Sequence, residues 1–259
     1  MKEKISENLY YKRIEYKDIY TTVYLIKTEK GCMLFDCASF DYDIDDTVKP
    51  FLDTLGVTAS DLKYVFISHN HKDHAGGLGR FLQLYPDVTV ITRSTELKAS
   101  FQGYSFIIPT ENEVFLDVLK VIFITGHSPC SQAIYDTRDN SMLTGDSLQL
   151  YGIFGSGNWA CNIKLPAEHF EALKKLEKMD ISAIYTAHDY HPLGQFYIGK
   201  EMIKEAIDAC RAPLYNIMKM MTDNPTLSDE EIMQLYNEGG KLPTAGPAVI
   251  TGLRAFINL

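Results

Sequence analysis

Three histidines and an aspartate crowd into six consecutive positions of this 259-residue chain, in the run His69-Asn70-His71-Lys72-Asp73-His74. The residues before the run, 64–67, form a short apolar stretch typical of a buried strand. We therefore expect the run to lie in a loop at the carboxyl end of a strand, where open α/β sheets often place their chemistry. Four ligand-type side chains at this density predict one or two bound metal ions.

The spacing within the run suggests how the ligands divide. His69 and His71 are two residues apart, so in an extended segment both project to the same side and can reach one ion. Asp73 and His74 are adjacent, and a turn would allow them to reach a second ion. Imidazole nitrogen and carboxylate oxygen both bind zinc, at roughly 2.0–2.2 Å.

Apolar runs with turn residues between them predict an α/β fold. Strands are expected at 21–27, 32–36, 64–67, 88–92, 105–108, 114–116, 118–125, 132–136, 141–144 and 181–187. Helices are expected at 43–55, 75–84 and 166–179, with a short one capped by Ser94. These elements form two β-rich halves with interleaved helices, which predicts two sheets sandwiched between helix layers.

Near residue 196 the sequence pattern changes from alternating strands and helices to helices alone. Residues 199–222 have a helical pattern that Pro213 is expected to kink or split. Ser228 begins a capping box for a second helix to about 238, and 248–259 is a candidate third helix. We therefore predict an α/β domain at 1–195 and a helical appendage at 196–259 that covers the site.

Composition narrows the class of protein. Hydrophobic residues make up 46% of the chain and charged residues 23%, as in a globular protein. The net charge of -9 argues weakly against nucleic acid as a partner and leaves a small-molecule substrate as the expected one. No apolar run approaches the roughly 20 residues that span a bilayer, so no membrane partner is expected, whereas a homo-oligomer is compatible with the sequence.

Five cysteines without a CxxC pair, and a charged N-terminus without a signal-peptide core, predict a cytoplasmic protein with reduced thiols. A disulfide between Cys32 and Cys37 is disfavoured because their odd separation along a strand points them to opposite faces.

The histidine run, which follows a strand and precedes Ala75-Gly76-Gly77, resembles the signature of the metallo-β-lactamase-fold hydrolase superfamily. Three further motifs match that family in chain order. They are Gly126-His127-Ser128-Pro129 after strand 118–124, Gly145-Asp146 at a strand end, and His188 after strand 181–187. Asp36 matches a family aspartate that supports the loops of the site. The resemblance spans about 20–195 and implies an αββα sandwich of two mixed sheets.

The resemblance also implies roles. One ion would be held by His69, His71 and His127, and the other by Asp73, His74 and His188, with Asp146 bridging both. The ions would be two divalent metals, zinc foremost, with iron or manganese as alternatives. Their bridging hydroxide would attack a scissile carbonyl, because bound dications lower the pKa of water to near 7. Asp73 would also act as a catalytic residue, orienting the hydroxide or moving a proton.

Each motif has an ordinary structural alternative. His127 beside Pro129 and Asp146 after Gly145 are residues that also form turns. His191 competes with His188, which we favour because it follows an apolar strand directly. Cys130 and Ala38 stand where the family usually has glycine, and for Cys130 a small buried residue is the favoured interpretation.

Single residues separate the family branches. The diiron redox branch usually has glutamate where this chain has His71, and the antibiotic-degrading branches lack the aspartate found here as Asp146. The remaining group hydrolyses thioesters, lactones, other esters or phosphodiesters. His188-Asp189-Tyr190 resembles the His-Glu-Tyr segment of hydroxyacylglutathione hydrolases, and the appendage resembles the substrate-covering helices of that group and of lactonases.

The expected function is therefore dinuclear metal-dependent hydrolysis of a small thioester, lactone or other ester. Loop 150–159 is a candidate substrate wall, and Tyr151, Trp159 and Tyr190 are candidate substrate residues. For Tyr151 and Tyr190, a packing or rim position is the favoured interpretation. A phosphodiester hydrolase is the first alternative, because two metals stabilise attacking and leaving oxygens equally well. A non-hydrolytic iron-binding redox or scaffold protein is the second, although the complete ligand set argues against a lost site.

Overall fold

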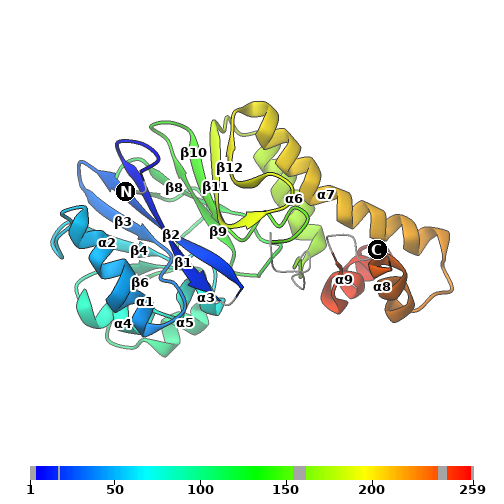
Figure 1. Ribbon diagram of the computed structural model, residues 1–259, viewed down its shortest axis with the longest axis horizontal. Coiled ribbons are helices and arrows are strands. Elements are labelled where there is room, and N and C mark those ends of the chain that lie inside the picture. The colour runs from blue at the N-terminus through cyan, green and yellow to red at the C-terminus, as the bar shows by residue number, and fades with distance from the viewer. Residues whose placement is uncertain (1–3, 17, 154–161, 239–243, 258–259) are drawn as a thin grey trace. The chain divides into compact units, whose positions relative to one another are not determined.

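The computed structural model describes residues 4–16, 18–153, 162–238 and 244–257, and its elements are labelled in Figure 1. The chain forms two compact units. The first comprises Met1–Ile122 and Gln132–Asp139, and the second comprises Phe123–Ser131 and Asn140–Leu259. Each unit is described by itself below.

The first unit contains a six-stranded mixed sheet in sequential order. Its strands are β1 (Leu9–Tyr16), β2 (Ile19–Thr28), β3 (Gly31–Phe35), β4 (Leu62–Phe66), β5 (Thr89–Ile91) and β6 (Ser105–Ile107). Strands β1 to β3 pair antiparallel, and β3 to β6 pair parallel. The parallel strands place their carboxyl ends on one edge of the sheet, and the histidine run follows the end of β4 at that edge.

Short helices follow the strands of this sheet. They are α1 (Asp41–Asp43), the π-helical segment η1 (Ile44–Val48), α2 (Lys49–Thr54), α3 (Lys72–Ala75), α4 (Leu78–Leu84) and α5 (Thr95–Ser100). Leu52 and Phe81 pack into one buried cluster with strand residues such as Leu34, Val65 and Val90. Burial of these apolar side chains is the main stabilising term for the unit. Ser94 caps α5 by accepting a hydrogen bond from the Leu97 amide, as predicted.

The second sheet is also six-stranded and mixed, with the order β12-β11-β10-β9-β8-β7. Its strands are β7 (Val114–Phe115), β8 (Leu119–Phe123), β9 (Gln132–Asp136), β10 (Ser141–Gly145), β11 (Ala183–Tyr190) and β12 (Gly194–Ile198). β10 pairs parallel with β11, whereas β12 pairs antiparallel with β11. Two mixed sheets with intervening helices confirm the predicted fold class.

Four helices belong to the second unit: α6 (Pro166–Glu177), α7 (Lys200–Asp223), α8 (Asp229–Asn237) and α9 (Pro247–Ile257). Ile217, Ile232 and Ile250, from the last three helices, share a buried cluster with Phe170 of α6. The capping box at Ser228 is present. The division of the chain at residue 196 stays a prediction.

The structure corrects several expected boundaries. Pro213 lies inside α7 without splitting it. The expected helix 75–84 is divided at Gly76 and Gly77, where the backbone passes close to another segment. Strand β12 is additional, and His188 lies within β11 rather than directly after it.

Cys32, Cys37, Cys130 and Cys210 are buried free thiols, so the disfavoured Cys32–Cys37 disulfide is absent from the described residues. None of the helices in the described ranges is long and apolar enough to cross a membrane.

Candidate metal centre

The histidine run lies directly beyond β4, in the first unit. His69, Asp73 and His74 are buried, and His71 is half-buried. The ring centroid of His69 lies 4.6 Å from that of His71 and 4.1 Å from that of His74. The Nε2 atom of His74 lies 3.3 Å from Oδ2 of Asp73. The run therefore gathers three imidazoles and a carboxylate in one small, largely water-excluded volume.

Asp36, directly after β3, stabilises this loop through its side-chain contacts. Its carboxylate accepts hydrogen bonds from the Ser68 amide at 2.7 Å and from Oγ of Ser68 at 2.9 Å. Oδ2 of Asp36 also lies 2.8 Å from Nδ1 of His74. Burial raises the pKa of the Asp36 carboxyl, while the contacts with His74 and Ser68 oppose that rise. Asp36 thus fixes both the backbone of the loop and the orientation of the His74 ring.

Two glycines allow the backbone of the loop to pack closely against the segment after β3. A Cβ atom at Gly76 would lie 2.1 Å from the Ser39 carbonyl oxygen, and one at Gly77 would lie 2.4 Å from the Cys37 carbonyl oxygen. The Cys37 amide donates to the His74 carbonyl at 2.7 Å. Only glycine allows so close an approach of two backbones. This explains why two glycines follow the histidine run.

The second unit contributes His127, on the loop after β8. Its Nδ1 lies 2.7 Å from the Asn162 carbonyl oxygen, which can only accept, so Nδ1 carries a proton and, in the neutral ring, Nε2 has the lone pair. Gly126 precedes it with φ +155° and its carbonyl accepts from the amides of Lys164 and Leu165, both at 2.9 Å. These contacts fix the His127 loop against the chain that leads into α6.

Asp146, directly after β10, faces two imidazoles of the second unit. Oδ1 of Asp146 lies 3.2 Å from Nε2 of His188, and Oδ2 lies 3.7 Å from Nε2 of His127. All three residues are buried. One carboxylate whose two oxygens each face an imidazole nitrogen is the arrangement that a bridging metal ligand requires. Of the competing histidines, His188 is the one in this group, while the backbone of His191 pairs with Tyr151 and Gly152.

Gln149 was not singled out in the sequence, yet it connects Asp146, Tyr190 and Asn162 within the second unit. Its Nε2 donates to the Asp146 carbonyl at 2.7 Å and lies 3.2 Å from the Tyr190 hydroxyl oxygen. Its Oε1 accepts from the Asn162 amide at 3.4 Å. In the sequence, the one signal for this role is that Gln149 follows the candidate ligand Asp146 by three residues.

The predicted substrate residues differ in their surroundings. Tyr190 is fully buried, and its ring meets that of His188 edge-on with centroids 5.9 Å apart. Tyr151 is half-buried, and Trp159 lies outside the described residues. Substrate contact by these three residues stays a prediction.

A further buried histidine, His169 of α6, packs against the His127 loop. A Cβ atom at Gly126 would lie 2.7 Å from both Cβ and Nδ1 of His169. Burial, with smaller contributions from His127 and Arg211, lowers the pKa of His169 to about 3. The imidazole is therefore neutral at physiological pH.

The donor atoms of both units fit divalent metal ions. In each unit a histidine presents Nε2 to a carboxylate oxygen while an oxygen acceptor holds its Nδ1: Asp36 for His74 and Asn162 for His127. Metal-binding histidines are held by their second nitrogen in this way, which fixes the tautomer and the ring. Imidazole and carboxylate donors suit zinc, iron or manganese.

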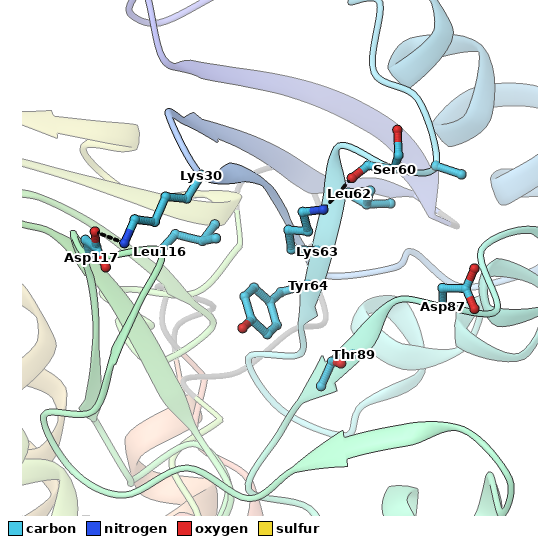
Figure 2. A pocket seen from close by; sticks show the side chains of 10 residues that line it. Lys30, Ser60, Leu62, Lys63, Tyr64, Asp87, Thr89, Leu116 and Asp117 are labelled. Carbon is cyan, nitrogen blue, oxygen red and sulfur yellow. Dashed lines mark hydrogen bonds and ion pairs between the residues drawn. The ribbon is translucent and has the colours of Figure 1, made fainter.

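A separate pocket of about 810 Å³ lies elsewhere in the first unit (Figure 2). Lys63 and Tyr64, near the start of β4, and Thr89, the first residue of β5, line it. Because β4 and β5 run parallel, this pocket lies at the opposite end of the strands from the histidine run. It is therefore not part of the candidate metal centre.

Two mixed sheets that carry candidate histidine and aspartate ligands define a class of metal-binding α/β proteins. The family model of the metallo-beta-lactamase superfamily matches residues 16–188. The chain belongs to this superfamily, as its motifs predicted.

Relatives and solved structures agree with this assignment. The hydroxyacylglutathione hydrolase of Prochlorococcus marinus (strain NATL1A) is 31% identical over 138 residues, which cover 50% of this chain and 52% of that protein. The chain thus matches about half the length of such curated relatives. A metallo-beta-lactamase family protein from Thermus thermophilus has a TM-score of 0.65 at 18% identity, covering 96% of this chain and 92% of the other. Rubredoxin oxygen:oxidoreductase from Desulfovibrio gigas has a TM-score of 0.65 at 13% identity, covering 98% and 83%. At such low identities, both structures support the fold alone.

Proposed function

We propose that this chain is a metal-dependent hydrolase that cleaves a small thioester, lactone or other ester. The observation that carries the proposal is the placement of Asp146, whose two carboxylate oxygens each face an imidazole Nε2. A carboxylate so placed can bridge two ions. The Prochlorococcus relative is named a hydroxyacylglutathione hydrolase, which supports hydrolysis of an acyl compound.

The proposed ligand sets follow the family pattern. His69, His71 and His127 would hold one ion, Asp73, His74 and His188 would hold the other, and Asp146 would contact both. Two divalent ions, zinc foremost, supply a Lewis acid for the carbonyl oxygen and a water whose pKa is lowered to about 7. Asp36 orients His74, and the Asn162 carbonyl orients His127.

The catalytic role that we assign to Asp73 rests on its position. Its carboxylate is buried beside Nε2 of His74 and belongs to a loop that Asp36 and Gly76 hold rigid. A carboxylate fixed in this way can orient the attacking water and accept its proton, as general base catalysis requires. The C–S or C–O bond to the leaving group then breaks, and the leaving thiolate or alkoxide takes up that proton from Asp73.

A hydrolysis screen tests this proposal. Metal-replete protein is assayed with a glutathione thioester, a lactone, a carboxylic ester and bis(p-nitrophenyl) phosphate. We expect the protein to hydrolyse the thioester, the lactone or the carboxylic ester. This activity should disappear when a chelator removes the metal and return when zinc is added. Activity on the phosphodiester alone would replace this proposal with a phosphodiesterase. Failure of all four substrates, together with tightly bound iron, would favour a redox function.

A further inference from the structure

Lys72 stands inside the histidine run, between the proposed ligands His71 and Asp73. Its Cα is one residue step, about 3.8 Å, from the Cα of each neighbour. The side chain is exposed, whereas those of Asp73 and His74 are buried. The ammonium group therefore lies on the solvent side of the candidate metal centre.

The ammonium of Lys72 rests on an aromatic ring. Nζ lies 4.1 Å from the ring centroid of Phe40, which stacks on Tyr42 with centroids 5.0 Å apart and planes 13° apart. Such a cation–π contact directs a lysine that would otherwise move freely. Tyr42 is 58% exposed, so this aromatic pair is open to solvent.

The aromatic pair is held in a fixed position relative to the histidine run. The Phe40 amide donates to Oδ2 of Asp43 at 3.0 Å. The segment before it is joined to the run by the bond from the Cys37 amide to the His74 carbonyl and by the close approach of Gly76 to Ser39. The position of the Lys72 ammonium is thus determined by the loop that carries the proposed ligands.

Several other lysines in the first unit have an oxygen atom as a partner. Lys30 pairs with Asp117 and Lys49 pairs with Asp53, and Lys63 donates to the Ser60 carbonyl (Figure 2). Within the described part of the chain, no carboxylate or carbonyl oxygen lies within bonding distance of Nζ of Lys72. With metal ions held by the neighbouring ligands, the ammonium of Lys72 would be repelled by their charge, and a bound anion would relieve that repulsion.

We propose that Lys72, seated on Phe40, binds a carboxylate of the substrate, so that this hydrolase prefers anionic esters or thioesters. The predicted substrate preference rests on the proposed hydrolase function, whereas binding of an anion by Lys72 does not. The carboxylate forms a charge-assisted hydrogen bond with Nζ, and its charge offsets the repulsion between the ammonium and the metal ions. The net charge of -9 makes a local cation useful for attracting such a substrate.

The experiment compares two esters that differ in one carboxylate, mono-p-nitrophenyl glutarate and p-nitrophenyl valerate. Metal-replete wild type, Lys72→Gln and Lys72→Arg are assayed, with Lys98→Gln as the matched loss of an exposed lysine in the same unit. We expect Lys72→Gln to lower the anionic-to-neutral ratio of kcat/KM about tenfold, mainly through KM. Lys72→Arg should retain most of the ratio, and Lys98→Gln should retain all of it. An unchanged ratio in Lys72→Gln would overturn the inference.

A binding measurement separates this inference from the proposed function. Glutarate itself is titrated calorimetrically into metal-replete wild type and Lys72→Gln, without turnover. We expect Lys72→Gln to bind glutarate more weakly than wild type. Binding by wild type should weaken with added salt, and the variant should lose this salt dependence. If these two esters and the thioester, lactone and ester of the hydrolysis screen are all left intact, the proposed function fails, while this difference in glutarate binding would still support the anion site. Equal glutarate binding by both proteins, or none by wild type, would overturn the anion site whatever the hydrolysis result.

Discussion

Nδ1 of His74 lies 2.8 Å from Oδ2 of Asp36, although 38 residues separate them in the chain. The contact joins the ends of two adjacent parallel strands, β3 and β4. It turns Nε2 of His74 toward the carboxylate of Asp73. A buried carboxylate outside the proposed ligand set therefore determines how a proposed ligand is aimed.

Asp36→Asn should weaken metal binding. The amide cannot accept from Ser68 and His74 as the carboxylate does, so the His74 ring loses its charge-assisted hydrogen bond. Loss of such a supporting contact typically lowers metal affinity by about 10- to 100-fold. Competition with a chromophoric chelator measures the affinity. Asp136→Asn, which removes a carboxylate paired with Arg138 in the same unit, is the control and should bind metal like wild type. Equal affinities in both variants would exclude a role for Asp36.

Asp146→Ala should remove the bridging ligand and with it one or both ions. Metal analysis of wild type should return about two ions per chain, and the variant should return fewer. Hydrolysis should be lost because the two carboxylate oxygens of Asp146 face His127 and His188. Asp180→Ala, an exposed carboxylate of the same unit, is the control. Full activity in Asp146→Ala would refute a dinuclear mechanism.

Gly76→Ala should destabilise the protein and loosen the centre. The added Cβ would lie 2.1 Å from the Ser39 carbonyl oxygen and 2.5 Å from the Lys72 carbonyl oxygen, so the backbone must move. Overpacking of this kind costs about 1–3 kcal/mol. Urea unfolding measures the free energy, and chelator competition measures the metal affinity. At Gly246 a Cβ would meet no atom within 4 Å, so Gly246→Ala should leave both quantities nearly unchanged. A Gly76→Ala protein as stable as Gly246→Ala would contradict the close backbone packing.

His169 should make the stability of the metal-free protein depend on pH. The unfolded chain protonates this imidazole below its ordinary pKa of 6.5, whereas the folded protein does so only near 3. The unfolded state binds more protons between these values, so stability falls as the pH drops from 6.5 toward 3. At pH 5 the loss is about 2 kcal/mol relative to pH 7.

Urea unfolding at both pH values, for wild type and His169→Leu, tests this dependence. The difference between pH 7 and pH 5 should be smaller in the variant because leucine does not titrate. Other groups contribute equally to both proteins and cancel in the comparison. The same pH dependence in both proteins would show that His169 titrates in the folded protein at its ordinary pKa.

Much of the fold was predictable because its signals are local. The apolar run 64–67 corresponds to β4 (Leu62–Phe66), and the capping residues Ser94 and Ser228 begin the predicted helices. β12 was missed because its alternation is weak, and its pairing with β11 is a tertiary contact. Pro213 lies within a continuous helix because buried side chains on both sides of it hold α7 together.

The residues of the candidate site also fall into those that local sequence signals indicate and those that depend on tertiary contacts. The histidine run was visible because its ligands are consecutive, and motif resemblance added His127, Asp146 and His188. Gln149, Asn162 and the Phe40 contact of Lys72 could not be predicted. They depend on backbone positions that separate segments reach only after folding. His188 sits within β11 where the register with β12 is irregular, a feature that no local pattern signals.

Anomalous diffraction from crystals of the zinc-replete full chain, recorded at the zinc absorption edge, tests the central claim most directly. The account predicts two peaks per chain that share Asp146, one with His69, His71 and His127 and the other with Asp73, His74 and His188. A single peak, or zinc bound without Asp146, would contradict it.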